Sequence, residues 1–294
     1  APVVWQYENS APTLPAGVSG GTAWQNTSNT PSFSWTASTD AGGSSLAGYD
    51  VYWGTDSYGT SVTAQPSGAS YLPGVQPSGT SNYLRVRARD NAGNVSAWTT
   101  AAPWQYETSA PTQPTNVQGG SPWQHASNAP SFSWSTSTDT GGSLMAGYDV
   151  YLGGDPNATT PTGMASSSPY APGAQPSGTS VYFRARARDN AGNTSGWTTA
   201  VLWQYDGSAP SVPGGVTGGT AWQNTNDTPA FAWADSTDSG GSGLSSYEVY
   251  WNTSASCGSV TAQLTATTYL PGPQSSGTSQ YFCVRATDNA GNAS

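Results

Sequence analysis

Residues 83–94 read Tyr-Leu-Arg-Val-Arg-Ala-Arg-Asp-Asn-Ala-Gly-Asn. Apolar Leu84, Val86 and Ala88 alternate with three arginines, which is the two-residue period of a half-buried β-strand. The Asp-Asn-Ala-Gly-Asn that follows is rich in turn-forming residues. The stretch therefore predicts a strand with an apolar face toward a core, an arginine row on its other face, and a tight turn at its end.

The chain repeats this stretch at residues 182–193 and 281–292, with a period of 99 residues. Trp-Gln-Tyr triplets begin at Trp5, Trp104 and Trp203 with the same period. A fixed period of this kind indicates an array of like structural units. It predicts repeat 1 at 8–106, repeat 2 at 107–205 and an incomplete repeat 3 at 206–294. Residues 1–7 form a separate segment that matches the last strand of a repeat.

Within one repeat the alternation predicts several further strands and no helix. Phe33 and Trp35 share one face of an expected strand, as do Tyr49, Val51 and Trp53 of another. Turn dipeptides such as Gly42-Gly43 and Pro73-Gly74 separate such segments. Six or seven short strands in about 99 residues are typical of an antiparallel β-sandwich.

Three motifs in this order carry a family resemblance: Phe-Ser-Trp, Gly-Tyr-Asp-Val-Tyr, and the stretch at 83–94. They resemble strands B, C and F and the F–G turn of fibronectin type III-like domains of bacterial surface and secreted proteins. The resemblance implies an all-β chain of three tandem antiparallel sandwiches, with strand G of repeat 1 at about 96–106. Repeat 3 is expected to lack its own last strand. The chain departs from the family at Asn82, Val181 and Gln280, where a corner tyrosine often stands.

Composition and charge exclude some classes of function. The net charge is −9, and the seven basic residues are all arginines. This balance argues against nucleic acid, whose binding requires a basic face. We find no apolar run of the length that a transmembrane segment needs. A chain with 8% charged and 12% aromatic residues is expected to be folded, and its composition favours an extracellular or cell-surface location.

Candidate catalytic residues are few, and we expect no enzyme activity. His125 is the only histidine, and asparagine takes its place in the sister repeats, at Asn26 and Asn224. Without a base in two of three copies, a serine triad is not credible. No phosphate-binding loop, Cys-x-x-Cys pair or histidine-rich metal spacing is present.

The missing last strand of repeat 3 suggests how copies of the chain assemble. A sandwich without strand G exposes the edge of strand F, which can template another strand. The expected donor residues are Val3, Val4, Trp5, Gln6 and Tyr7, and the expected acceptor residues are Tyr281, Phe282, Cys283, Val284, Arg285 and Ala286. Head-to-tail donation between subunits would build a homopolymeric filament. The alternative is a segment of a longer secreted protein, a glycan- or matrix-binding adhesin segment or accessory module.

Two further features have a structural and a functional interpretation. Cys257 and Cys283 are expected to form a disulfide, with two free thiols as the alternative. Arg85, Arg87 and Arg89 should face Asp50 on strand C in an exposed ladder, or alternatively form a ligand-binding face. For stacking on a sugar, the candidates that sequence places in loops are Trp24, Trp123 and Trp222.

One polar cluster is a candidate Ca²⁺ site. In each repeat an aspartate of the B–C loop and the Asp-Asn of the F–G turn should lie at the same pole of the sandwich. The candidate ligands are Asp40, Asp90, Asn91, Asp139, Asp189, Asp238 and Asp288. A linker acid arrives at the same pole: Glu8, Glu107 or Asp206. Oxygen-only ligands suit Ca²⁺; the alternative is that these residues only form Asx turns and loop hydrogen bonds.

Overall fold

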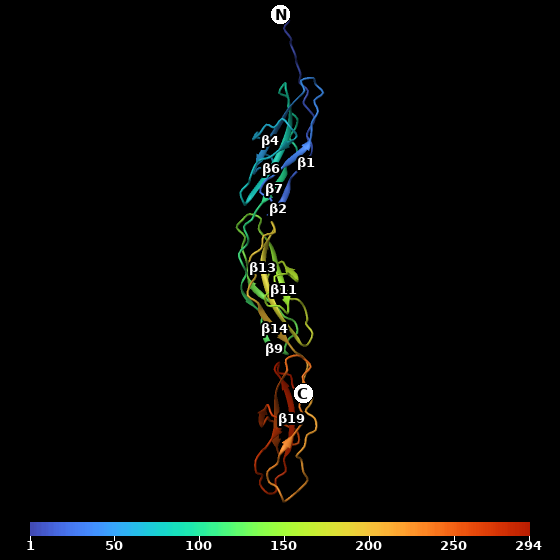
Figure 1. The fold of residues 1–294 in the computed structure, drawn as a ribbon, viewed down its shortest axis with the longest axis vertical. Coiled ribbons are helices and arrows are strands. Elements are labelled where there is room, and N and C mark those ends of the chain that lie inside the picture. Colours follow the sequence, from blue (N-terminus) through green and yellow to red (C-terminus); the bar gives the residue numbers. More distant parts are fainter. The chain divides into compact units, whose positions relative to one another are not determined.

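The computed structural model describes residues 1–294 as β-strands joined by turns and loops, without a helix (Figure 1). Repeat 1 contains β1 (Ala16–Ser19), β2 (Thr22–Gln25), β3 (Phe33–Thr36), β4 (Leu46–Gly54), β5 (Ser70–Tyr71), β6 (Thr80–Asp90) and β7 (Ala102–Tyr106). Repeat 2 contains β8 (Thr115–Gln118), β9 (Ser121–Gln124), β10 (Ser133–Ser135), β11 (Met145–Gly153), β12 (Gly163–Ala165), β13 (Thr179–Asp189) and β14 (Val201–Tyr205). Repeat 3 contains β15 (Phe231–Ala232), β16 (Leu244–Asn252), β17 (Ala262–Leu264), β18 (Thr268–Tyr269) and β19 (Tyr281–Asp288).

Repeat 1 is built from two sheets, with the strand orders β1-β3-β5 and β2-β7-β6-β4. All their pairings are antiparallel except that of β2 with β7. Strands β1, β3 and β5 correspond to A, B and E of the fibronectin type III-like arrangement, and β4, β6 and β7 to C, F and G. The all-β fold class of tandem sandwiches predicted from the sequence is therefore confirmed.

The core of repeat 1 lies where the alternation of the sequence places it. Leu84, Val86 and Ala88 on β6 are 0% exposed, and Phe33 and Trp35 on β3 are 1% and 6% exposed. Each large apolar side chain buried in this way stabilises the fold by about 1.5–3 kcal/mol. The same side chains could not be buried in a slipped register, because a shift of one residue turns every side chain of a strand to the other face.

The larger sheets of repeats 2 and 3 differ at one edge. In repeat 2 the order is β12-β11-β13-β14-β9, whereas in repeat 3 it is β17-β16-β19. No strand corresponding to β7 or β14 pairs with β19, so this edge keeps free backbone donors and acceptors. Its core is correspondingly more open: Phe282 is half-buried, whereas Leu84 and Phe183 at the equivalent positions are 0% exposed.

Contacts between residues divide the chain into two compact units rather than three. The first unit comprises 1–114, 136–149 and 186–197, and the second comprises 115–135, 150–185 and 198–294. Repeat 2 contributes to both units, so the structure does not isolate it as a domain. The boundaries 8–106, 107–205 and 206–294 remain predictions from the period of the sequence.

The arginine row of β6 is not the exposed ladder that the sequence predicted. Asp50 faces it from β4 as expected, but is only 2% exposed. Its carboxylate lies 3.0 Å from Arg87 and 3.4 Å from Arg89. The segment between β6 and β7 bonds along β6, through Thr99 N to Val86 O, and brings Trp98 over Arg87. Asp50 is buried because Trp98 and its segment cover the arginines that pair with it.

Candidate metal centres and a candidate glycan-binding face

Three carboxylates meet at one place in each repeat, as the sequence predicted for the B–C and F–G loops. The groups are Glu8, Asp40 and Asp90; Glu107, Asp139 and Asp189; and Asp206, Asp238 and Asp288. In each group one oxygen of every residue lies within 4.8 Å of the others. The linker acid comes directly after a Trp-Gln-Tyr triplet, the second acid lies in the B–C loop, and the third ends strand F.

In repeat 2 hydrogen bonds hold all three acids in place. Asp189 at the end of β13 accepts bonds from the backbone and side-chain nitrogens of Asn193, both at 2.8 Å. Asp139 accepts from Gly141 N at 3.1 Å. Glu107 is 0% exposed, and its Oε2 accepts from Ser143 N at 2.6 Å. Its other oxygen, Oε1, is buried without a donor, although buried polar atoms nearly always have one.

Glycine leaves room for the linker acid in the position that it occupies. A Cβ atom on Gly141 would collide with Glu107 Oε1, as one on Gly42 would with Glu8 Oε1. The Asp-x-Gly-Gly sequence of the B–C loop therefore does two things at once. It supplies the second carboxylate, and it leaves space for the first to enter the cluster.

The predicted ligand Asn91 has another role in the structure. Its side-chain nitrogen donates to the carbonyl oxygens of Ser44 and Ser45, at 2.8 and 3.0 Å. Asn190 and Asn289 make the equivalent bonds in repeats 2 and 3. Asn91 therefore ties the F–G turn to the B–C loop instead of joining the carboxylates, because its amide is engaged by main-chain acceptors.

Two of the carboxylates are held in the charged form. Burial alone would raise the pKa of Asp90, but hydrogen bonds from Asn94, Gly93 and Ala92 together lower that pKa below its ordinary value. For Asp206, burial is likewise outweighed by donors from Ser208, Ser242 and Ser177, and the pKa is lowered. Charged carboxylates gathered at one point repel one another unless a cation lies between them.

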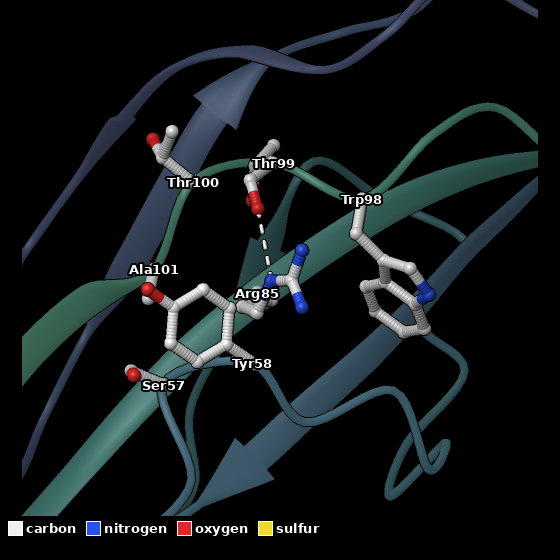
Figure 2. A pocket seen from close by; sticks show the side chains of 7 residues that line it. All are labelled: Ser57, Tyr58, Arg85, Trp98, Thr99, Thr100 and Ala101. Atoms are coloured by element: carbon white, nitrogen blue, oxygen red, sulfur yellow. Dashed lines mark hydrogen bonds between the residues drawn. The ribbon is translucent and has the colours of Figure 1, made fainter.

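A shallow pocket on repeat 1 brings an aromatic pair to either side of an arginine. Figure 2 shows the Arg85 guanidinium between the Tyr58 ring and the Trp98 indole. Arg85 Nε donates to the Thr99 carbonyl at 3.0 Å, and Tyr58 is 82% exposed. We call Tyr58, Arg85 and Trp98 the aromatic face. The sequence analysis included Arg85 in a possible ligand-binding face but missed the two aromatic residues. Trp98 recurs as Trp197 with the period of 99, whereas Asn157 stands in the place of Tyr58 in repeat 2.

The three tryptophans predicted for sugar stacking are not equivalent. Trp24 lies on β2 and Trp123 on β9, both half-buried, and only Trp222 is a loop residue with an open side chain, 79% exposed. The prediction that Trp24 and Trp123 lie in loops was wrong. A short strand forms there because β2 and β9 add in parallel to the last strands, β7 and β14.

Cys257 and Cys283 form a disulfide in repeat 3, with their Cα atoms 6.0 Å apart. The equivalent positions of repeat 1 are joined by a hydrogen bond from Arg85 to the Gly59 carbonyl, at 3.3 Å. Repeat 2 has the same bond, from Arg184 to the Ala158 carbonyl, at 2.8 Å. The disulfide thus replaces a polar link that fastens the loop after strand C to strand F.

The expected donor segment is open to solvent. Val3, Val4, Trp5 and Tyr7 are 95%, 76%, 84% and 71% exposed, and Gln6 is exposed as well. Trp104 and Trp203, the repeat equivalents of Trp5, are only 3% and 4% exposed. The single chain does not bring these residues to the acceptor strand β19. In β19 Tyr281 and Arg285 are exposed, Phe282, Cys283 and Val284 are half-buried, and Ala286 is buried.

The strand order and the recurrence of the motifs define the class of protein: the chain is a tandem array of fibronectin type III-like repeats. The resemblance noted in the sequence is therefore confirmed. No protein-family model matches the chain. The structure contains no apolar helix of the length that a bilayer crossing needs.

The chain spans about a quarter to a third of the length of the relatives that it matches by sequence. The chain is 37% identical to exoglucanase B of Cellulomonas fimi, over 98% of this chain and 25% of the relative. It is 38% identical to exoglucanase A of the same organism, over 97% of this chain and 31% of the relative. Chitinase A1 of Niallia circulans is 36% identical over 67% of this chain and 26% of the relative. The extracellular location expected from the composition fits these relatives.

Two solved structures are also similar. The chicken CNTN1 FN1–FN3 domains match 97% of this chain and 96% of their own, with 13% identity and a TM-score of 0.37. The Clostridium thermocellum CbhA fibronectin(III)-like modules match 66% of this chain and 94% of their own, with 12% identity and a TM-score of 0.38.

Proposed function

We propose that the chain is a non-catalytic accessory segment of a secreted polysaccharide-degrading protein. The observation that carries the proposal is the similarity to exoglucanase B, which covers 98% of this chain but 25% of the relative. A chitinase and two exoglucanases share the similarity, so what is common to the relatives is action on polysaccharide. The chain spans only 25–31% of these relatives, which supports an accessory role.

The aromatic face is the contact that we propose for the polysaccharide. Sugar rings present C–H faces that pack against aromatic rings, and hydroxyls that accept hydrogen bonds from a guanidinium. Tyr58 and Trp98 offer two rings, and Arg85 offers donors between them (Figure 2). The pocket is shallow and open, which suits one side of an extended chain.

We expect the purified protein to be retained weakly by microcrystalline cellulose or by chitin, and Tyr58→Ala or Trp98→Ala to weaken retention about tenfold. A tenfold loss corresponds to about 1.4 kcal/mol, within the range for one aromatic contact. The measurement is depletion of the protein from solution at increasing amounts of polymer.

Trp197→Ala is the matched control for the aromatic face. Trp197 covers Arg186 at 4.9 Å in repeat 2 much as Trp98 covers Arg87 at 4.8 Å, but Asn157 stands where repeat 1 has Tyr58. We expect this variant to bind like the wild type. Equal losses in Trp98→Ala and Trp197→Ala, or no retention on either polymer, would refute the proposed contact.

A second candidate function is strand donation between copies of the chain, building a filament. The comparisons give it no support, but one geometric observation favours it. Trp5 is 84% exposed while Trp104 is 3% exposed at the equivalent position, and β19 has an unpaired edge where β6 has β7. Beside that edge lies a groove whose lining includes Phe231, Trp251 and Phe282.

If strands are donated, the protein associates with rising concentration and Trp5→Ala weakens association by at least about tenfold. The estimate follows from the ~1.5–3 kcal/mol that burial of a large apolar side chain contributes. Sedimentation velocity measures the size distribution. Tyr58→Ala, which removes an exposed aromatic outside both segments, should leave association unchanged. A monomer at every concentration would exclude this function while leaving the accessory role intact.

A further inference from the structure

We propose that Glu107, Asp139 and Asp189 bind a calcium ion, and that Glu8, Asp40 and Asp90 bind a second one. The two groups occupy the same position in successive repeats, and in each one oxygen from every residue lies within 4.8 Å of the others. This inference is independent of the proposed polysaccharide contact, since neither group includes a residue of the aromatic face.

One buried oxygen of Glu107 has no hydrogen-bond donor within the protein. The side chain is 0% exposed, its Oε2 is bonded to Ser143 N, and its Oε1 has no donor. Leaving a charged acceptor buried and unpaired destabilises a fold more than leaving a neutral one does. Glu8 shows the same division in repeat 1: Oε2 accepts from Ser44 N at 2.7 Å, and Oε1 is buried without a donor.

The ion pairs of the arginines lie outside these groups. Arg87 and Arg89 pair with Asp50, Arg186 and Arg188 with Asp149, and Arg285 with Glu248. Arg85 and Arg184 donate to main-chain carbonyls near the other end of the strand. The chain has no lysine, so the seven arginines are its only basic side chains apart from His125. A cation from solution is therefore the remaining source of positive charge.

The chemistry and number of the carboxylate ligands favour Ca²⁺. Carboxylates suit hard cations, and no sulfur or imidazole ligand is present that would favour zinc. Calcium–oxygen bonds of about 2.3–2.6 Å allow two ligands to lie at most about 4.6–5.2 Å apart. Magnesium bonds of about 2.0–2.1 Å allow about 4.2 Å at most, and magnesium seldom uses three carboxylates of one protein. Three carboxylates of one protein at a single point therefore fit Ca²⁺ better than Mg²⁺.

The third group differs from the other two. Asp206 is one methylene shorter than glutamate, and both its oxygens have donors. Oδ1 accepts from Ser177 Oγ at 2.8 Å and Ser208 N at 2.9 Å, and Oδ2 accepts from Ser242 N at 3.0 Å. These donors satisfy both oxygens of Asp206, whereas Oε1 of Glu107 has no donor. The geometry therefore assigns two calcium ions to the chain, not three.

An ion at Glu107 would join a linker to two loops. Glu107 directly follows β7, whereas Asp139 lies in the B–C loop of repeat 2 and Asp189 at the end of β13. Asn193 already bonds both the Glu107 carbonyl oxygen, at 3.1 Å, and Asp189. Calcium would strengthen this junction by binding only the folded arrangement, which raises stability with ion concentration.

The test is a calorimetric titration of the whole EDTA-treated chain with calcium chloride, together with thermal unfolding. We expect two equivalents bound and a higher melting temperature with calcium. Glu107→Gln should bind one equivalent, and Glu8→Gln with Glu107→Gln none. Without calcium, Glu107→Gln should melt no lower than the wild type, because one of three repelling charges is gone. Asp139→Asn gives a second variant of the same site in case Glu107→Gln fails to fold.

Two controls make the outcome decisive. Asp235→Asn removes an exposed charge outside the clusters and should leave two equivalents. Magnesium chloride should bind at least about tenfold more weakly than calcium chloride. No calcium binding by the wild type, or unchanged binding by Glu107→Gln and Asp139→Asn, would overturn the proposal. If the wild type bound a third equivalent of calcium that Asp206→Asn lost, the assignment of only two sites would be wrong. If magnesium bound as tightly as calcium, the choice of ion would be wrong.

Discussion

Replacement of Trp104 by alanine is expected to lower the unfolding free energy of repeat 1 by about 3–5 kcal/mol. Trp104 on β7 is 3% exposed and packs with Trp53 and Tyr106, at ring-centroid distances of 6.2 and 5.8 Å. Its removal would leave a cavity that the two sheets cannot close. Hydrogen exchange of peptides from repeat 1 measures the loss without interference from the other repeats.

The matched control is Trp5→Ala, which changes the same residue type at the equivalent position one period earlier. Trp5 is 84% exposed and contacts Tyr7, at a centroid distance of 6.0 Å. For the single chain we expect an effect below about 0.5 kcal/mol, as for other surface substitutions. Comparable effects of the two substitutions on the single chain would mean that residues 1–7 are packed in solution, contrary to the structure.

Loss of the Cys257–Cys283 disulfide is expected to destabilise repeat 3 by about 3–4 kcal/mol, the chain-entropy value for a loop closed over 26 residues. The first two repeats contain no cysteine and should not respond to the reductant. Thermal unfolding with and without dithiothreitol, followed by hydrogen exchange in each repeat, measures the difference. Free thiols detected by mass in the untreated protein would contradict the bond.

Replacing the two cysteines of repeat 3 by the residues at the equivalent positions of repeat 1 tests whether a hydrogen bond can substitute for part of the disulfide's stabilisation. Cys257→Gly with Cys283→Arg places in repeat 3 the pair that repeat 1 has at Gly59 and Arg85. The new hydrogen bond should recover about 0.5–1.5 kcal/mol relative to a double serine variant. If the swap is no more stable than the double serine variant, the Arg85–Gly59 bond is not the functional equivalent of the disulfide.

Much of the fold follows from local patterns. The alternation of Leu84, Val86 and Ala88 placed these residues in the core, where they are 0% exposed. Loop positions were less predictable. Trp24 carries no strand signal of its own, and its strand exists because β7 offers a free edge beside it. Such a pairing depends on a segment far along the chain, which a local pattern does not contain.

The candidate metal centre was partly predictable. Sandwich topology brought the B–C and F–G loops to one pole, so the meeting of Asp139 and Asp189 was expected, as was the arrival of Glu107. The role of Asn91 was not, because the direction of a side-chain amide depends on which main-chain carbonyls remain unbonded. The sequence also did not predict that Glu107 has an oxygen without a donor while Asp206 has none, since this depends on the donors that surround each carboxylate.

The 99-residue period alone was sufficient to predict the repeat unit. The alternation of apolar and polar residues was sufficient to predict the strand faces and the buried aromatic residues, because successive side chains of a strand point to opposite faces. Three features could be recognised only in the folded chain. They are the burial of Asp50 beside the arginine row, the aromatic face, and the oxygen of Glu107 that has no donor. In each case the deciding contact joins different segments of the chain: Trp98 covers Arg87, Tyr58 approaches Arg85, and Glu107 meets Asp189. Burial and charge at such sites are set by what packs around them, and only the tertiary structure specifies that.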